Sequence, residues 1–434
     1  MLTRRARCAS IFLVLAMFTV AACGDDDDTT AEPTAESTES APESTTGSTT
    51  ELSTESTAVG TTEAPPEASG EPIRFGAMFD QTGTHAPVGV PERQAFETMV
   101  RLINDAGGVD GRPLEVDIRD SQSSPDVAVE IARDFVREEY AAIFGPTPAA
   151  FCQAVQPIVE AAQVFTYCIS PIGTLSDYLQ LVDAPFQQVA GDITAQLFAE
   201  RGWKRVACLA TADASGEGYR KSFEAAAPNY GLELVANETF QYGDTDVTAQ
   251  LTRIRRADPD VLFSCASGGN HIAVLTGMRQ LDMDIPVFAG HGGVSFDVAK
   301  LAANTLPKGE VLSVGSWVMV PDQLPEDFSG APLVKEFVAA YAEDHDGALP
   351  DTIGAYVADA LRIVTLAVEA GADPNSGTSL SETIRGMCPA QGIAFEYCFS
   401  EDNPRGVPAG GERVILRWND SGAFDLVEVL DVQE

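Results

Sequence analysis

The chain is poor in basic residues, in histidine and in long apolar runs. Its 434 residues include 27 Lys and Arg against 65 Asp and Glu, a formal net charge of −38, and only four His. This acidic excess excludes the basic surface that nucleic-acid binding needs, and it disfavours any polyanionic partner. No apolar run approaches the roughly 20 residues of a membrane-spanning helix. With 44% apolar residues, the chain can still bury extensive cores, and it is too long for one compact domain.

Sequence motifs of catalysis and of metal binding are also absent. The sequence contains no GxSxG, HExxH, P-loop or dinucleotide-binding motif in a strand-to-helix context. It also has no CxxC or Cys/His spacing of the kind that binds zinc. Four scattered histidines make a few Asp/His pairs expected by chance. We therefore expect no enzymatic activity, no bound metal and no cofactor.

Residues 1–22 have the features of an export signal. Three arginines near the N-terminus precede a short apolar segment, Ile11–Val20, which is too short to remain in the bilayer. The segment leads into Val20-Ala21-Ala22-Cys23, which resembles the lipobox of bacterial lipoproteins. The alternative is an ordinary secretory signal cleaved after Ala22, with Cys23 incidental. A lipidated Cys23 would hold the protein at the outer face of the cytoplasmic membrane, or in the cell envelope, without a transmembrane helix.

The next segment, residues 23–71, begins with this cysteine and continues as an acidic stretch rich in Ser and Thr. Residues 24–71 carry 13 acidic side chains, no basic ones and almost no large apolar ones. Such a composition cannot bury enough surface to offset the entropy lost on ordering, so we expect a disordered tether. As a flexible coil it would span about 35–40 Å.

Six cysteines follow the tether, in the oxidising surroundings that an export signal implies. One predicted disulfide brackets a short glycine-containing segment. Another joins the start of a predicted helix to the end of the following strand, two points that meet at one edge of a parallel sheet. These two pairs are Cys388–Cys398 and Cys152–Cys168. Cys208 and Cys265 both lie in strand-like runs, where a cross-strand bridge is geometrically awkward, so their pairing stays open.

Strands and helices alternate regularly from residue 72 onward. Phe96, Met99 and Ile103 have the spacing of one helical face, and Ser124-Pro125 is typical of a helix start. A second series of strands and helices runs from about residue 192 to 288. Such alternation predicts parallel sheets covered by helices on both faces.

The two series predict two doubly wound α/β lobes joined by a hinge of several strands. Two long helices follow, over about 332–344 and 351–370, and then short strands and turns over about 391–430. We expect these later pieces to return to the first lobe and then to cross back. The predicted lobes are residues 72–187 with about 320–388, and residues 188–319 with about 389–434. Because ligands bind where parallel strands end, the two lobes should close over a ligand in a central cleft.

Several predicted strand-end loops carry recognisable motifs. In order along the chain these are Asp80–Gly83 (DQTG), Asn104–Arg112 (NDAGGVDGR), Asp120–Pro125 (DSQSSP), Gly145–Thr147 (GPT) and Ile169–Thr174 (ISPIGT). Together they resemble the branched-chain amino-acid (Leu/Ile/Val) receptor family, substrate-binding lipoproteins of ABC importers with the type I periplasmic-binding fold. Weaker similarity continues to Tyr356, so the resemblance covers nearly all of residues 72–434.

The resemblance implies which residues hold the ligand. In that family hydroxyls and backbone N–H groups of the first lobe grip a ligand carboxylate. Carried over by motif, this grip falls on Thr147, Gly173 and Thr174, with Thr82 and Gly83 on the first strand-end loop. Further cleft positions are Ser215, which stands where many members have an aromatic residue, His291, and the possible cleft tyrosine Tyr356. A turn glycine, a capping histidine and a core tyrosine are the structural alternatives for Gly173, His291 and Tyr356.

The other histidines carry weaker expectations. His85 lies on the first strand-end loop and is a further candidate to contact a ligand. His271 and His345 are expected to face solvent. Trp317, beside a predicted hinge segment, is a lesser candidate.

One departure from the family pattern concerns the ligand ammonium. The family's carboxylate partner for this group falls on residues 290–293, which contain no acid. A buried, unpaired ammonium would cost several kcal/mol, so an α-amino acid is disfavoured unless Asp213 or Glu217 substitutes. An amide or an aliphatic or aromatic carboxylate fits better than a branched-chain amino acid.

Three functions remain open from the sequence. The first is a lipid-anchored receptor that captures a small solute outside the cell and passes it to an ABC permease. The second is a sensor of the same fold, which would signal to a membrane receptor. The third is an envelope interaction protein with a vestigial cleft.

Overall fold

The computed structural model describes residues 68–170, 176–181, 187–290, 294–325 and 328–432. Within these ranges lie two large sheets with helices on both faces, and one small two-stranded sheet. None of the helices described is long and apolar enough to cross a membrane. The predicted export signal, Cys23 and most of the tether lie outside the described residues.

The first sheet is entirely parallel, with strand order β2-β1-β3-β4-β5. In chain order its strands are β1 (Ile73–Phe79), β2 (Leu114–Asp120), β3 (Ala142–Phe144), β4 (Phe165–Cys168) and β5 (Leu179–Leu181). The helices of this first lobe are α1 (Ala86–Asp105), α2 (Pro125–Arg137), α3 (Ala149–Ala162), α9 (Ala331–Asp344), α10 (Thr352–Glu369) and α11 (Gly377–Ile384).

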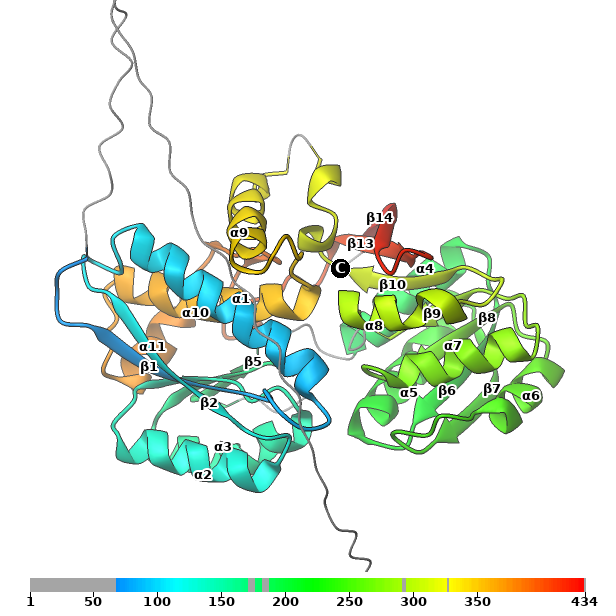
Figure 1. Cartoon of the computed structure of the whole chain (residues 1–434), viewed down its shortest axis with the longest axis horizontal. Helices are drawn as coiled ribbons and strands as arrows, with labels where there is room; N and C mark the ends of the chain where they lie inside the picture. The colour runs from blue at the N-terminus through cyan, green and yellow to red at the C-terminus, as the bar shows by residue number, and fades with distance from the viewer. Residues whose placement is uncertain (1–67, 171–175, 182–186, 291–293, 326–327, 433–434) are drawn as a thin grey trace, which may run out of the picture. The chain divides into compact units, whose positions relative to one another are not determined.

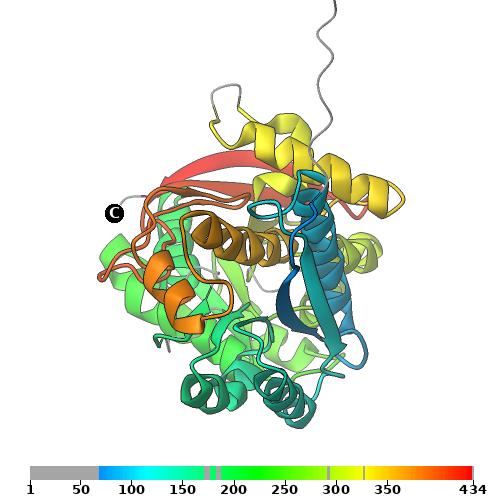
Figure 2. The same ribbon diagram turned by 90° about the vertical axis from the view of Figure 1, so that its left-hand side faces the viewer.

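Alternating side chains of β1 pack on opposite faces of this sheet. Phe79 meets Phe96 of α1, with ring centroids 5.5 Å apart, on the face that also carries α10. On the opposite face the backbone at Gly76 lies against the ring of Phe135 in α2, where a Cβ atom would come within 2.9 Å of the ring. Figures 1 and 2 both show α10 beside α1. The fold class predicted from alternation is confirmed for this lobe.

The second sheet has seven strands in the order β14-β13-β10-β9-β8-β6-β7. In chain order they are β6 (Arg205–Thr211), β7 (Glu233–Phe240), β8 (Val261–Cys265), β9 (Val287–Ala289), β10 (Val311–Gly315), β13 (Gly411–Trp418) and β14 (Phe424–Val432). The first five are parallel to one another, whereas β13 is antiparallel to both β10 and β14.

Helices cover both faces of the second sheet as well. These are α4 (Thr194–Glu200), which continues a π-helix over Gln187–Ile193, α5 (Ala214–Ala226), α6 (Thr248–Arg256), α7 (Asn270–Gln280) and α8 (Phe296–Ala302). Short 3₁₀ turns in the described residues include Ala227–Tyr230, Ala303–Thr305, Trp317–Met319 and Pro321–Gln323. Phe198, Phe223, Phe263 and Phe288 form one aromatic cluster beneath α4 and α5. The opposite face packs against α6, α7 and α8.

Three chain segments connect the lobes, after β5, after β10 and before β13. The small sheet pairs β11 (Ala390–Gln391) with β12 (Glu396–Tyr397) and is bonded to α10. Asp359 of α10 accepts hydrogen bonds from the backbone N–H groups of Ile393 and Ala394. These hydrogen bonds group the small sheet with the first lobe. The chain returns to the second sheet at Gly411, the first residue of β13.

The C-terminal region differs from the expected short strands and turns. β13 and β14 are long and antiparallel, because the tight turn between them, with Gly422 at φ 75°, can only join antiparallel neighbours. β10 ends at Gly315, and a 3₁₀ turn over Trp317–Met319 begins the crossing to the first lobe.

Candidate interlobe binding site

A pocket of about 280 Å³ lies between the carboxyl ends of the parallel strands of both lobes. From the first lobe, Asp80 follows β1, Thr147 follows β3, and Ser170 follows β4. From the second, Asp213 follows β6. This is the edge where open parallel sheets bind ligands, because loops and helix N-termini converge there. The remaining described lining residues are Thr84, His85, Pro87, Val88, Gly89, Pro148, Ala149, Ala150, Phe151, Ile169, Ala214, Ser215, Tyr219, Tyr242, Ser267, Gly268, Gly269, Val298, Ile353 and Tyr356.

Aromatic side chains from both lobes form one wall of the pocket. The ring centroid of His85 lies 6.0 Å from that of Phe151, in its own lobe, and 6.2 Å from that of Tyr242 in the other lobe. Tyr242 is 44% exposed, an unusual state for a large aromatic ring. Aromatic surface open to a cavity is typical of small-molecule sites.

Many family members have an aromatic residue at the position of Ser215. In this chain Tyr219 supplies an aromatic side chain beside that position. Both residues lie in α5, four positions apart and therefore on the same helix face, and both line the pocket. The sequence analysis missed Tyr219, although the i, i+4 spacing was available to find it.

The N-termini of α3 and α5 lie at the pocket. The first residues of α3, Ala149 and Ala150, line it, as does Ala214 at the start of α5. α1 and α5 each approach the end of the first strand of their lobe closely because a glycine of the helix faces that strand end. A Cβ on Gly89 would lie 2.3 Å from the Asp80 carbonyl oxygen, and one on Gly216 would lie 2.2 Å from that of Thr211. The partial positive charge of these helix ends favours an anionic group.

Asp213 is the acidic group of the second lobe in the pocket. Its Oδ1 caps α5 by accepting a hydrogen bond from the Gly216 N–H at 2.8 Å, and it accepts another from the Thr211 hydroxyl at 2.9 Å. Its Oδ2 accepts no hydrogen bond from the described residues. Glu217, the other acid considered above, points away and pairs with Arg220 and Lys221. Of the two acids, only Asp213 is placed to meet a ligand.

Two further acids lie on the first-lobe side. Asp80 lines the pocket and accepts hydrogen bonds from the Ser121 hydroxyl and the Ser123 N–H, and burial raises its pKa. No Lys or Arg occurs among the described lining residues, and His85 is their one basic side chain. Any anionic part of a ligand must therefore be held mainly by neutral donors.

Glu92 is buried directly behind Thr147. Its side chain is fully inaccessible, its Oε2 lies 2.6 Å from Thr147 Oγ1, and its Oε1 has no hydrogen-bond partner in the described part of the chain. Burial raises the pKa of Glu92 well above its usual value, and the negative charges of Asp351 and Asp80 raise it further. Both effects favour the neutral carboxylic acid form of Glu92.

The predicted site residues fall into three groups. Thr147, Ser215 and Tyr356 line the pocket. Thr82 and Gly83 do not, since the Thr82 hydroxyl donates to Asp120 at 2.7 Å and Gly83 occupies a turn with φ 86°. Gly173, Thr174 and His291 lie outside the described residues.

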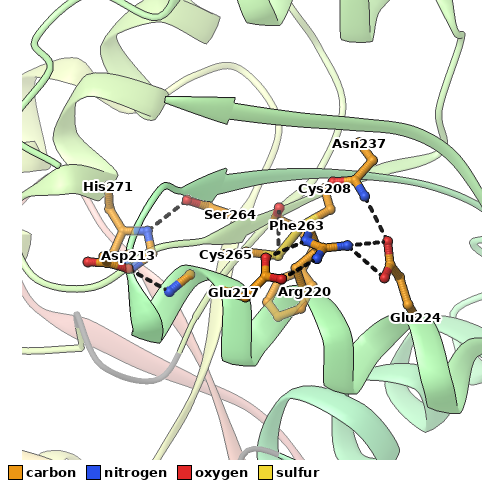
Figure 3. Close-up of a disulfide and its surroundings, with 11 residues drawn as sticks. Cys208, Asp213, Glu217, Arg220, Glu224, Asn237, Phe263, Ser264, Cys265 and His271 are labelled. Carbon is orange, nitrogen blue, oxygen red and sulfur yellow. Dashed lines mark hydrogen bonds and ion pairs between the residues drawn. A yellow bond between two sulfur atoms is a disulfide. The ribbon is translucent and has the colours of Figure 1, made fainter. Parts of the chain in front are cut away.

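The expectation that His271 faces solvent is wrong. His271 is 1% exposed, and its Nδ1 lies 2.8 Å from the Ser264 hydroxyl (Figure 3). Burial lowers its pKa to about 4, so the ring is neutral. His345 is half-buried against Tyr341. Neither histidine lines the pocket.

Three disulfides are present in the structure. Two of them join the pairs expected from position, Cys388–Cys398 and Cys152–Cys168. The open question of Cys208 and Cys265 is answered by a bond between β6 and β8 (Figure 3). Cys208 lies opposite Phe263, so Cys265 is its diagonal neighbour on the same sheet face, with a Cα separation of 6.3 Å. That offset is within the range that a disulfide spans.

Two α/β lobes, three connections and one pocket at their facing strand ends define a hinged solute-binding protein. The model of the family described as Periplasmic binding protein matches residues 72–419, and the chain belongs to this family. A relative named Leu/Ile/Val-binding protein homolog 3, from Brucella melitensis, is 22% identical over 361 residues, which cover 80% of this chain and 92% of the relative.

Solved structures agree in fold. The substrate-binding protein LivJ of a Streptococcus pneumoniae branched-chain amino acid transporter, solved with isoleucine, matches with a TM-score of 0.71 and 23% identity. The match covers 83% of this chain and all of LivJ. A solute-binding protein of an ABC transporter from R. palustris, solved with benzoate, matches with a TM-score of 0.69 and 16% identity, over 84% of this chain and 98% of that one. Proteins of this fold therefore include binders of an amino acid and of an aromatic acid.

Proposed function

We propose that this protein captures a small amino acid in the interlobe pocket and delivers it to an ABC importer. The observation that carries the proposal is the pairing of helix N-termini with one second-lobe carboxylate, Asp213, in a pocket that has no Lys or Arg among its described lining residues. Helix ends suit a ligand carboxylate, and Asp213 suits its ammonium group. The missing acid at residues 290–293 is thereby replaced from a different loop.

Thr147 would contact the ligand carboxylate, with Glu92 behind it. In the structure the Thr147 hydroxyl donates to Glu92 Oε2 at 2.6 Å. Protonation of Glu92 allows the reverse arrangement, in which the Glu92 O–H donates to Thr147 Oγ1. The Thr147 hydroxyl hydrogen is then available to donate into the pocket. An ionised Glu92 would instead accept that hydrogen and leave Thr147 with no donor for an anion.

Ligand capture would favour a closed arrangement of the lobes. Asp80, Thr147 and Phe151 come from one lobe and Asp213 and Tyr242 from the other. A ligand that touches both sets binds the closed state better than the open one, and that difference drives closure. The closed form is then the state that a permease would recognise.

A binding panel with matched variants tests the ligand proposal. Calorimetry with branched-chain, small polar and aromatic amino acids, and with the corresponding amides and deaminated acids, should identify at least one amino acid as a ligand. Asp213→Asn should weaken that ligand at least about tenfold, because it removes a charge-assisted contact. Glu217→Gln on the same helix should not. Binding of deaminated acids alone, or equal effects of the two variants, would refute the role of Asp213.

We further propose that a lipid on Cys23 holds the protein at the outer face of the membrane, with residues 24–71 as the tether. The support is the lipobox-like sequence before Cys23. Cys23→Ser should move the protein from the detergent-extracted membrane fraction to the soluble fraction, and should abolish labelling with an alkyne fatty acid. Unchanged membrane association of this variant would refute the anchor.

A further inference from the structure

A second cavity of about 320 Å³ lies at the hinge, apart from most of the interlobe pocket. Segments of all three connections meet around it, represented by Val189, Ser316 and Arg413. Trp317, a lesser ligand candidate of the sequence analysis, lines this cavity and not the interlobe pocket. Tyr356 contributes to both.

Arg413 of β13 places a buried guanidinium on the cavity wall. Its side chain is 5% exposed, and its hydrogen bonds all go to backbone carbonyl oxygens: Nη1 to Gly410 and Glu412, and Nη2 to Pro408. The ring of Phe395 covers it, with the Cζ atom 5.3 Å from the ring centroid. Backbone carbonyls satisfy N–H groups but do not neutralise a full positive charge.

No carboxylate of the described chain neutralises this guanidinium. Arg413 forms no ion pair with any described residue, and its Nε–H donates to none of them. Glu396 and Glu412 also line the cavity, but their side chains are exposed, and neither forms an ion pair with Arg413. Burial also lowers the pKa of Arg413, in keeping with an uncompensated charge.

A second polar group on the cavity wall lacks a partner. The hydroxyl of Ser316 is buried, lines the cavity and forms no hydrogen bond in the described part of the chain. A buried guanidinium edge and an unused hydroxyl around one space are the donors that a carboxylate accepts, with the guanidinium binding its oxygens in pairs.

We propose that the hinge cavity is a second small-molecule site, which takes a small carboxylate held by Arg413 and Ser316. Apolar walls from Val314, Trp317 and Phe395 suit an aliphatic or aromatic body on that carboxylate. The site is independent of Asp213 and of the amino-acid ligand proposed above. Because its walls come from the connections between the lobes, an occupant there contacts the segments that bend during closure.

The test uses 4-bromobenzoate, whose bromine can be located by anomalous scattering. Crystals of the wild-type protein soaked in this probe should show a bromine peak in the hinge cavity, with the carboxylate against Arg413. In solution, Arg413→Gln should weaken this binding at least about tenfold and Ser316→Ala about threefold, as expected for losing a charged and a neutral donor. Arg417→Gln, an exposed position on the same strand paired with Asp425, is the matched control.

Each result decides for or against the hinge site. Should Arg413→Gln fail to fold, Ser316→Ala and the bromine position carry the test. A peak confined to the interlobe pocket, or a hinge peak whose binding in solution is unaffected by Ser316→Ala and Arg413→Gln, would overturn the proposal. Asp213→Asn should leave the hinge peak in place, so failure of the amino-acid proposal is distinguished from failure of this one.

Discussion

Replacing Glu92 by glutamine should make the protein more stable, increasingly so as pH rises. The Glu92 carboxyl is completely buried, one of its oxygens has no partner in the described chain, and its nearest charged neighbours are the acids Asp80 and Asp351. The pKa of Glu92 is higher in the folded protein than in the unfolded chain. Its full contribution to the free energy of unfolding is therefore present below the unfolded pKa of 4.5, and it is lost as pH rises toward the folded pKa. Glutamine has the same shape, cannot ionise in either state, and can donate its amide N–H to Thr147.

The size of the effect follows from proton linkage. While the unfolded chain is ionised at this position and the folded chain is not, wild-type stability falls by about 1.4 kcal/mol per pH unit relative to Glu92→Gln. Above the unfolded value of 4.5 the free energies of unfolding should therefore diverge at about this rate until the pH reaches the folded pKa of Glu92.

Urea denaturation at several pH values measures this divergence directly. Subtracting the two proteins removes the titration of every other group, His271 included. Glu130→Gln, an exposed glutamate on α2, is the matched control and should follow the wild type at all pH values. If the Glu92→Gln and wild-type curves run parallel with pH, Glu92 is ionised in the folded protein and the donor role given to Thr147 is refuted.

Two further predictions concern the disulfides and His271. Replacing Cys152 and Cys168 by alanine opens a loop of 16 residues, which should destabilise the protein by about 3 kcal/mol and weaken ligand binding, since α3 and the end of β4 both line the pocket. The same change at Cys388 and Cys398 should leave affinity intact; equal losses of affinity would refute the positioning role. The pKa of His271 is about 4 in the folded protein and 6.5 in the unfolded chain. The contribution of His271 to the free energy of unfolding is therefore fully present above pH 6.5, and about 3 kcal/mol of it is lost as pH falls. His271→Gln should flatten this acid-side slope in urea titrations, and an unchanged slope would show that the ring is not neutral in the fold.

Much of the architecture was predictable because local sequence and tertiary packing agree. The two long helices predicted over about 332–344 and 351–370 are α9 (Ala331–Asp344) and α10 (Thr352–Glu369). Ser124 caps α2 through a hydrogen bond from the Val127 N–H, as its sequence position indicates. The short helix α11, in contrast, was not predicted, because its eight residues offer too few turns for a clear apolar period.

The sequence predicted the position of the binding pocket better than it predicted the residues that line it. Strand-end loops located Thr147 and Ser215, but Tyr242 comes from the loop after β7, which no motif singled out. Glu92 and His271 were missed or misjudged for a different reason. Glu92 is in phase with Phe96 and Met99, and His271 with Val274 and Leu275, so periodicity placed both on buried faces. A polar residue on such a buried helix face is therefore expected to have a structural or binding role.

The disulfides also bear on how the protein can respond to its surroundings. Cys152–Cys168 joins α3 to β4 within the first lobe, Cys208–Cys265 joins β6 to β8 within the second, and Cys388–Cys398 closes a loop beside α11 and the small hairpin. None of these three disulfides joins one lobe to the other. Reducing conditions should therefore lower the stability of each lobe, and weaken ligand binding through loss of Cys152–Cys168, without changing how far the two lobes move relative to one another.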